Sequence, residues 1–417
     1  MLQSTEYDVL ILGGGPAGST AATLLAEAGR SVAVVERRAA EDFKIGESLM
    51  PATYDTFARL GVLDLLERSD FPRKYSVQFY TKNGKASAPF YFFNDTPDPS
   101  STTWQVLRSE FDQLLLERSA EAGAEIQRRV RVRDVLFDGD RATGARLQLS
   151  NGEIVEVSAK VIVDATGQRA FLARKLGIVE VDPSLKKASL YTHFEGAFRD
   201  EGIDEGATLI LHTTDAESWF WYVPMPNDRV SVGVVGGVET LVTSRSGSPQ
   251  EIFEEEVEKC LEIKQRLTGA RQVRDMAVVR DFSYRAKQIS GPGWVLLGDA
   301  YSFIDPVYSS GLLLALKSGE MGADSILDAF EHDDFSAARL GSFEPLLEKG
   351  MRPIRGLVNA FYSQDFSFGK FLGRYPEHQK DIVDILVGRV FDREFGALFE
   401  HMGEMFESLE LPQPVRA

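Results

Sequence analysis

Three glycines at the spacing Gly13-x-Gly15-x-x-Gly18 are the strongest candidate for phosphate chemistry in the sequence. The first allows a tight strand-to-helix turn, the second lets the backbone approach a pyrophosphate, and the third allows close helix–strand packing. N–H groups at the start of the following helix favour the anion. Glu36 lies 18 positions after Gly18, where a carboxylate accepts hydrogen bonds from a ribose. An ordinary glycine turn is the alternative, and the flanking elements decide between the two.

Those flanking elements predict one βαβ unit. Tyr7 to Leu12 is a short apolar run rich in β-branched residues, typical of a strand buried on both faces. The segment after Gly18 has a helical period, and Gly29 is its predicted C-cap. Ser31 to Val35 is a second strand, which Glu36 closes. The glycines therefore lie where a dinucleotide-binding site requires them.

The rest of the chain alternates between helical and strand-rich segments. The patterns predict mostly helix over 45–70, antiparallel strands over 75–104, a helix over 108–122 and strand-like segments over 124–157. They predict buried strands over 160–164 and 293–297, a second antiparallel block over roughly 186–285, and helices from 311 onward. The second domain is thus predicted to be interleaved with the nucleotide-binding one.

Composition and charge exclude several classes of function. The 417 residues include 46 basic and 63 acidic ones, and the net charge of −17 argues against a nucleic-acid or anionic-membrane partner. A single cysteine, Cys260, excludes an internal disulfide. The five histidines show no H-x-x-H spacing, so we expect no metal site. No signal peptide or membrane-length apolar run is visible, which makes a cytoplasmic location the default expectation.

Two later features distinguish FAD from NAD as the dinucleotide. Gly298-Asp299 follows a predicted strand, and Arg108 opens a predicted helix. Together they resemble the glutathione-reductase type of FAD fold, in the subgroup shared with aromatic hydroxylases. No second G-x-G-x-x-G follows a strand, so no separate NAD(P)H domain is visible. The cofactor contacts that this resemblance implies are Gly13, Gly15, Ala17, Gly18, Glu36, Arg37, Ser48, Arg108, the backbone near Val132, Gly298, Asp299 and Gly311.

Two further motifs narrow the reaction. Residues 219–224 (WFWYVP) fit W-x-W-x-[IV]-P, and residues 303–311 (FIDPVYSSG) fit F-x-x-P-x-x-S-x-G. Both resemble the marks of flavin-dependent halogenases, over residues 1 to 320. The resemblance implies a substrate pocket or gate formed by Trp219, Trp221, Pro224, Phe303 and Pro306. The plain alternative is that these aromatic residues only line a core or pocket.

The resemblance also implies a halide site and a catalytic lysine. The halide positions are Ser310 and Gly311, at a predicted helix N-terminus that favours anions. An ordinary N-cap serine is the alternative. Lys74 matches the family lysine, whose buried amine can donate a hydrogen bond to hypohalous acid or form a haloamine. Most lysines are solvated surface residues, and Lys44 is the nearest rival.

One departure from the family pattern points to a substrate branch. Halogenases of free tryptophan carry a glutamate just before the Ser/Thr-Gly segment, where this chain has Tyr308. The chain therefore resembles the phenol- and pyrrole-type branch, whose substrates are often tethered to an acyl or peptidyl carrier protein. The acidic surface is a weak argument against docking an acidic carrier. The resemblance further implies reduced FAD from a separate reductase, with O2 and chloride or bromide as co-substrates.

The sequence thus predicts an α/β FAD-binding (Rossmann-like) domain with an interleaved antiparallel-sheet substrate domain and a helical C-terminal region. The boundaries we expect are 1–72, 105–182 and 283–330 for the FAD-binding domain, 73–104 and 183–282 for the substrate domain, and 331–417 for the helical region. The predicted function is halogenation of an electron-rich aromatic compound by an oxidoreductase. Two alternatives stay open: an aromatic hydroxylase or geranylgeranyl-reductase-like enzyme, and a non-enzymatic flavin-binding redox sensor.

Overall fold

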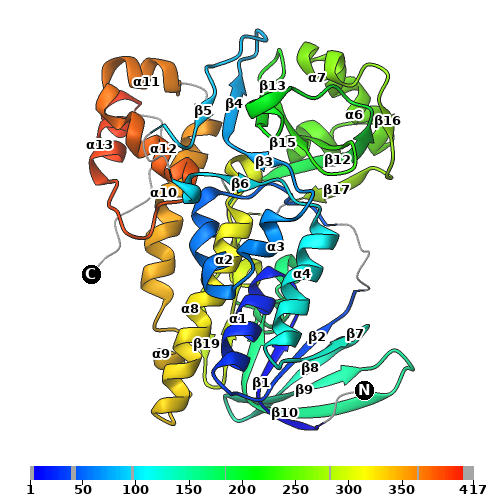
Figure 1. Ribbon diagram of the computed structural model, residues 1–417, viewed down its shortest axis with the longest axis vertical. Helices are drawn as coiled ribbons and strands as arrows, with labels where there is room; N and C mark the ends of the chain where they lie inside the picture. The colour runs from blue at the N-terminus through cyan, green and yellow to red at the C-terminus, as the bar shows by residue number, and fades with distance from the viewer. Residues whose placement is uncertain are drawn as a thin grey trace.

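The computed structural model describes residues 4–38, 44–94, 98–183, 185–280, 283–363 and 366–406. One half of the molecule is built on a mostly parallel sheet in which the first strand of the chain, β1 (Glu6–Leu12), and the late strand β20 (Trp294–Leu296) are separated by a single strand, β10 (Ile154–Asp164) (Figure 1). The other half contains a mostly antiparallel sheet, and the C-terminal helices lie beside it (Figure 1). This arrangement matches the predicted fold class. The predicted domain boundaries stay a prediction.

The parallel sheet is formed by segments far apart in the sequence. Its strands run in the order β20-β10-β1-β2-β7, and all four neighbouring pairs are parallel. The central strands are buried and apolar, as expected for a parallel sheet covered on both faces, whereas the edge strand β7 is only partly buried. The strands are β1 (Glu6–Leu12), β2 (Val32–Glu36), β7 (Glu125–Arg128), β10 (Ile154–Asp164) and β20 (Trp294–Leu296).

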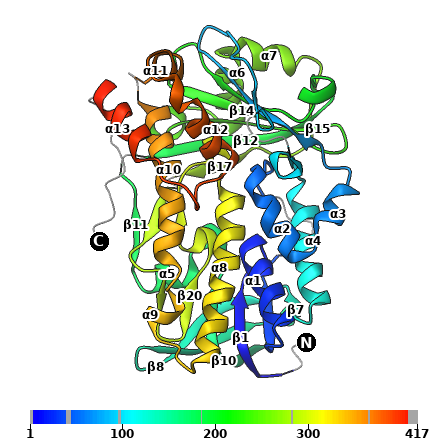
Figure 2. The same ribbon diagram turned by 60° about the vertical axis from the view of Figure 1, so that its left-hand side comes forward.

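Three helices cover one face of this sheet. Helix α1 (Pro16–Glu27) packs between α4 (Arg108–Glu121) and α8 (Gly311–Glu331). Small residues allow close approach, since a Cβ added at Gly319 would lie 2.6 Å from the Ala17 carbonyl oxygen. Figure 2 shows the three helices side by side along the sheet. Helix α1, which follows the glycine motif, therefore packs directly against α8, which begins at Gly311.

A hairpin pairs with the first half of β10 and corrects one predicted strand. Strands β8 (Arg131–Asp138) and β9 (Arg141–Gln148) form an antiparallel pair, and β9 pairs with the first half of β10. The predicted short strand over 160–164 is therefore the second half of one strand, Ile154–Asp164. Its first half is half-exposed because it belongs to the hairpin rather than to the buried sheet. Because this half is not continuously apolar, the sequence pattern did not show that residues 154–164 form one strand.

The second sheet is mostly antiparallel. Its path is β16-β12-β15-β14-β13-β4-β5, with β17 beside β12, and only β4 and β13 pair in parallel. The members are β4 (Ser76–Tyr80), β5 (Phe90–Tyr91), β12 (Lys187–Glu195), β13 (Thr208–His212), β14 (Ser218–Pro224), β15 (Arg229–Gly237), β16 (Arg271–Gln272) and β17 (Ala277–Arg280). Two smaller sheets are separate: β3 (Arg73–Lys74) pairs with β6 (Thr103–Trp104), and β18 (Tyr284–Ala286) pairs with β11 (Val179–Val181) and β21 (Ser302–Phe303). Strand β19 (Ser290–Gly291) extends the parallel sheet beside β20.

Two stretches differ from the sequence prediction. Residues 45–50 are not helical, and the helices α2 (Tyr54–Leu60) and α3 (Leu63–Glu67) begin only after them. The predicted strand block over 186–285 is interrupted by α6 (Pro249–Glu258) and α7 (Leu261–Arg266). These two helices cover the far face of the second sheet, where Phe253 packs on Phe220 with ring centroids 5.8 Å apart.

The C-terminal region is helical, as predicted. After the short helices α5 (Phe171–Lys175) and α9 (Ala337–Leu340), the long helix α10 (Glu344–Tyr362) runs beside α8 (Figure 2). It leads into α11 (Phe368–Arg374), α12 (Gln379–Val387) and α13 (Gly396–Met405), drawn in orange and red in Figure 1. Of the helices described, none combines the length and the hydropathy needed to cross a bilayer.

Candidate functional site

The glycine-rich turn between β1 and α1 is tight on one side and open on the other. A Cβ at Gly13, whose φ is +113°, would lie 2.3 Å from the Ala165 carbonyl oxygen, and one at Gly18 would lie 2.0 Å from the Gly13 carbonyl oxygen. A Cβ at Gly15 would meet no protein atom within 4 Å. The N-terminus of α1 thus faces free space, and this geometry fits a bound pyrophosphate.

Glu36 lies beside this turn, at the end of β2. Its Oε2 accepts a hydrogen bond from the Gly14 N–H at 2.8 Å, and its Oε1 accepts one from the Arg38 N–H at 2.8 Å. The carboxylate is therefore fixed at the carboxyl end of the strand, where a ribose would lie in a dinucleotide-binding unit. Arg37, also predicted as a cofactor contact, is exposed next to it.

Arg108 is held at the first turn of α4 by two partners. Its Nη1 donates to the Ile45 carbonyl oxygen at 2.7 Å, and its Nε donates to Oδ1 of Asp112 at 2.8 Å. Lys44 pairs with the same carboxylate. Burial by itself would raise the pKa of the Asp112 carboxyl, but Arg108 and Lys44 together hold it below its usual value. Lys44 is thus engaged in an ion pair, which makes it a poor candidate for a free reactive amine.

Gly298 and Asp299 form a turn after β20 that contacts α1. A Cβ at Gly298 would lie 3.1 Å from the Ala17 Cβ, and the Gly298 N–H donates to the Ser318 hydroxyl at 2.7 Å. Burial raises the pKa of Asp299 to about 7, with Arg108 opposing the rise. Arg108 and Asp299 therefore act on one another across the predicted cofactor site although 191 positions separate them. Their contacts with FAD stay predictions.

Ser48 and Val132 were also predicted to contact the cofactor. The Ser48 hydroxyl accepts a hydrogen bond from the Lys74 amine at 2.8 Å and lies 3.0 Å from the Thr208 hydroxyl. Val132 is buried in β8 opposite Leu147. The described contacts thus connect Ser48 with the lysine site, and a cofactor role for either residue stays a prediction.

Lys74 lies in the short strand β3 and is buried, with 3% of its surface exposed. Its Nζ donates to the Ser48 hydroxyl at 2.8 Å and to the Leu49 carbonyl oxygen at 2.9 Å. No carboxylate is among these partners, and burial lowers the pKa of the amine to about 7. The Phe92 ring lies 5.5 Å from Nζ. A substantial fraction of the amine is therefore neutral near pH 7, and a neutral amine is nucleophilic.

Glu47 is a buried site residue that the sequence analysis missed. Its Oε1 lies 2.9 Å from Nε2 of His193, and its Oε2 accepts from the Ser231 hydroxyl at 3.4 Å. The same hydroxyl accepts from the Trp221 indole N–H at 3.1 Å. Because Glu47 precedes Ser48, one loop connects the Trp221 indole with the Lys74 amine. The available signal was a single acidic residue, Glu47, immediately before the predicted cofactor contact Ser48.

Trp219, the other indole of the motif, is tied to the opposite wall. Its N–H donates to the Tyr362 hydroxyl at 3.0 Å, and that hydroxyl donates to Oδ2 of Asp305 at 3.1 Å. Burial raises the pKa of Asp305 to about 7. The rings of Trp219 and Trp221 lie 6.3 Å apart, with Phe361 at 5.6 Å from Trp219. Strand β14 thus joins the lysine loop on one side to the segment before α8 on the other.

The segment before α8 brings the predicted halide residues into a constrained turn. Ser309 adopts a φ of +59°, which is uncommon for a residue with a side chain. Ser310 is buried at the N-cap of α8, and Gly311 opens the helix with Phe303 against it. Pro306 begins the 3-10 turn of this segment, and Pro224 ends β14. The long helix α8 begins at this turn, and the N–H groups at a helix N-terminus favour an anion.

Comparisons with known proteins agree with this geometry. The family model described as an FAD binding domain matches residues 6–319. A 1H-pyrrole-2-carbonyl peptidyl-carrier-protein chlorinase from Pseudomonas fluorescens is 30% identical, covering 97% of this chain and 94% of the relative. The chain belongs to the flavin-dependent halogenases. A corresponding brominase from Pseudoalteromonas luteoviolacea is 31% identical over 94% of this chain and 95% of its own length.

Solved structures support the same membership. The flavin-dependent brominase Bmp2 superposes on this halogenase with a TM-score of 0.85 at 28% identity, covering 97% of this chain and 100% of that one. The predicted resemblance to flavin-dependent halogenases, the FAD-binding fold class and the assignment as an FAD-dependent oxidoreductase are confirmed. The alternatives of a hydroxylase-type enzyme and a redox sensor are correspondingly disfavoured. The roles of the individual site residues stay predictions.

Tyr308 occupies the position at which tryptophan-type halogenases carry a glutamate. Its hydroxyl donates to the Leu357 carbonyl oxygen at 3.1 Å, and its ring packs edge-on against Phe361 at 6.1 Å. The side chain therefore ties the turn to α10 and places no carboxylate at this point. Asp305 and His193 are two further buried polar residues near the site that sequence reasoning did not single out.

Replacing Tyr362 with phenylalanine is expected to lower the free energy of unfolding by about 1–3 kcal/mol, because the Trp219 N–H loses its buried acceptor and Asp305 loses a donor. Denaturant unfolding of the purified protein measures this change. Tyr375→Phe is the matched control, since the Tyr375 hydroxyl makes only a 3.4 Å contact with Glu404 at the surface. Equal stability losses in the two variants would contradict the importance of the Trp219–Tyr362–Asp305 contacts.

Proposed function

We propose that this halogenase uses reduced FAD, O2 and chloride or bromide to halogenate an electron-rich ring, with a pyrrole carried on a carrier protein as the favoured substrate. The buried amine of Lys74 is the observation that carries the proposal, because it offers a neutral nucleophile in a site without a paired carboxylate. The substrate class is supported by two relatives that act on pyrrole-2-carbonyl peptidyl-carrier proteins.

When bound, reduced FAD supplies the activation of O2 that oxidises a halide to hypohalous acid. The residues of this chain then have three tasks. The amide groups at the start of α8, next to Ser310 and Gly311, hold the halide anion. The indoles of Trp219 and Trp221 form a wall that keeps the organic substrate away from the flavin. Lys74 receives the oxidised halogen and directs it onto the substrate ring.

Exclusion of water is a further task of the polar contacts around β14. The indole N–H groups of Trp219 and Trp221 are both bonded within the protein, to Tyr362 and Ser231. These contacts fix the rings, and a fixed apolar wall limits the loss of oxidant to solvent.

The partners that we propose are a flavin reductase and a carrier protein. A reductase is required because no second dinucleotide motif is visible in the sequence, and reduced FAD would reach the enzyme by diffusion. A carrier protein would deliver the pyrrole as a thioester. The net charge of −17 does not favour contact with an acidic carrier. Docking would therefore depend on a local patch of the surface that is less acidic than the whole.

The test is an assay with purified halogenase, reduced FAD and bromide. Pyrrole-2-carbonyl loaded on a peptidyl carrier protein is compared with free pyrrole-2-carboxylate and with simple phenols and indoles, and mass spectrometry reads the bromine isotope doublet. We expect the doublet on the loaded carrier. A doublet only on a free compound would replace the tethered substrate, whereas halide-independent oxygenation with NAD(P)H would favour a hydroxylase.

A further inference from the structure

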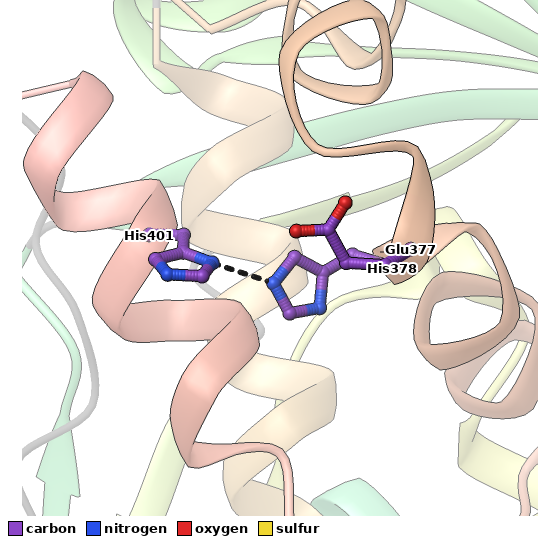
Figure 3. Close-up of side chains that lie close together, drawn as sticks. All are labelled: Glu377, His378 and His401. Carbon is purple, nitrogen blue, oxygen red and sulfur yellow. Dashed lines mark hydrogen bonds between the residues drawn. The ribbon is translucent and has the colours of Figure 1, made fainter.

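Two histidines from different C-terminal helices face one another outside the proposed active site. His378 closes a 3-10 turn (Pro376–His378) just before α12, and His401 lies on α13. Nε2 of His378 lies 2.8 Å from Nδ1 of His401. The carboxylate of Glu377 lies beside this gap (Figure 3), and one potential ligand atom from each of the three residues falls within 4.8 Å of the other two.

The two rings are fixed by packing and by an outer carboxylate. His378 is buried, stacks on Phe371 and directs Nδ1 to Oδ2 of Asp381 at 2.8 Å. Asp381 is itself paired with Arg393 at 3.1 Å. His401 stacks on Tyr375, with centroids 4.4 Å apart and ring planes within 9° of parallel. A metal-binding histidine typically donates its second ring proton to such a carboxylate.

The proton positions leave room for a cation between the rings. If neutral His378 donates its Nδ1 proton to the Asp381 carboxylate, Nε2 of His378 carries a lone pair. His401 then donates from Nδ1 across the 2.8 Å gap. If His401 instead carries its proton on Nε2, both facing nitrogens present lone pairs, and a metal ion can replace the shared proton.

We propose that Glu377, His378 and His401 bind a divalent transition-metal ion of the zinc type. Zinc at about 2.0–2.1 Å from two imidazole nitrogens sets them about 3.3 Å apart, so the gap needs to open by only about 0.5 Å. Two imidazoles and one carboxylate suit zinc, whereas Ca²⁺ and Mg²⁺ prefer oxygen ligands throughout. Glu377 is exposed, which leaves a fourth position open to water.

The site would connect α12 with α13. Helix α11, which precedes the site, contributes to an aromatic cluster in which Phe366 contacts Phe371 and Phe406, and Phe368 reaches Phe79 on strand β4 of the second sheet. An ion that binds only the folded chain stabilises it by mass action. The metal therefore stabilises the helical region that packs beside the substrate sheet, without contact with Lys74 or the flavin site.

The experiment uses the full chain without an affinity tag, stripped with a chelator that is then removed. Zinc chloride is titrated by calorimetry, and cobalt(II) is added separately to record visible absorption. We expect one equivalent of zinc, cobalt bands typical of a tetrahedral site, and a higher unfolding temperature with zinc. His401→Gln should weaken zinc binding more than about a hundredfold, because an inner ligand counts for more than an outer-shell partner.

Two further variants test the site even if His401→Gln does not fold. Glu377→Gln changes an exposed side chain, so it should fold and bind zinc at least about tenfold more weakly even if His401→Gln does not fold. His332→Gln is the control, because His332 lies in an exposed group with Asp328 and Glu331 on α8 and its Nδ1 is already engaged by the Asp328 carbonyl oxygen. Absence of a stoichiometric site, or unchanged affinity in Glu377→Gln, would overturn the proposal, as would loss of binding in His332→Gln alone.

Discussion

Lys74→Ala is expected to reduce the rate of halogenated product formation by at least about a hundredfold, the effect typical of losing a group that takes part directly in chemistry. FAD binding should remain, because no described contact connects the Lys74 side chain with the glycine turn or Glu36. Its partners are Ser48 and Leu49, on the loop that also carries Glu47. Mass spectrometry of the product, together with the absorption spectrum of bound FAD, measures both expectations on one preparation.

Lys82→Ala is the matched control, since Lys82 is an exposed lysine in the turn that follows β4. It should halogenate at the wild-type rate. The wild-type rate should also rise between about pH 6 and about pH 8, because the pKa of the Lys74 amine is about 7 and the neutral form is the nucleophile. Unchanged product formation in Lys74→Ala would remove this residue from the mechanism.

The fold was predictable where local patterns and burial agree. The helix predicted over 108–122 is α4, Arg108–Glu121. The prediction was correct because the apolar residues spaced at the helical period are the ones that this helix buries. The helix α6 was missed although Ser248 and Glu251 form a capping box, with each side chain bonded to the other's backbone N–H. The segment was assigned to the antiparallel block over 186–285 because the segments around it have the apolar pattern of strands.

The sequence motifs of the candidate site could be predicted, but the contacts between residues distant in the sequence could not. Glu47 and His193 lie 146 positions apart, and only the packing of the second sheet on the loop at 45–50 brings them to 2.9 Å. Likewise, no local pattern reveals that Lys74 is buried while Lys44 is paired with Asp112. His378 and His401 lack metal-ligand spacing in the sequence and meet only because the 3-10 turn before α12 lies against α13. Long-range contacts of this kind are set by the tertiary structure.

Gly15→Val is expected to give a folded protein that has lost at least about a hundredfold in FAD affinity, because the added side chain would occupy the space in which the pyrophosphate approaches the backbone. Two observations predict correct folding. The backbone of Gly15 has φ −79° and ψ −177°, which valine adopts readily, and a Cβ there meets no protein atom within 4 Å. The purified variant should be colourless, with a circular dichroism spectrum like that of the wild type.

Gly18→Val separates loss of cofactor from loss of fold. A Cβ at Gly18 would lie 2.0 Å from the Gly13 carbonyl oxygen, so this variant forces α1 away from β1 and should be strongly destabilised. Gly15→Val has no such contact, and its unfolding temperature should match that of the wild-type protein stripped of FAD. A normal flavin spectrum in folded Gly15→Val would refute the placement of the pyrophosphate. Unfolding of both variants alike would show that the turn tolerates no side chain, and the open face of Gly15 would then not be the reason for its glycine.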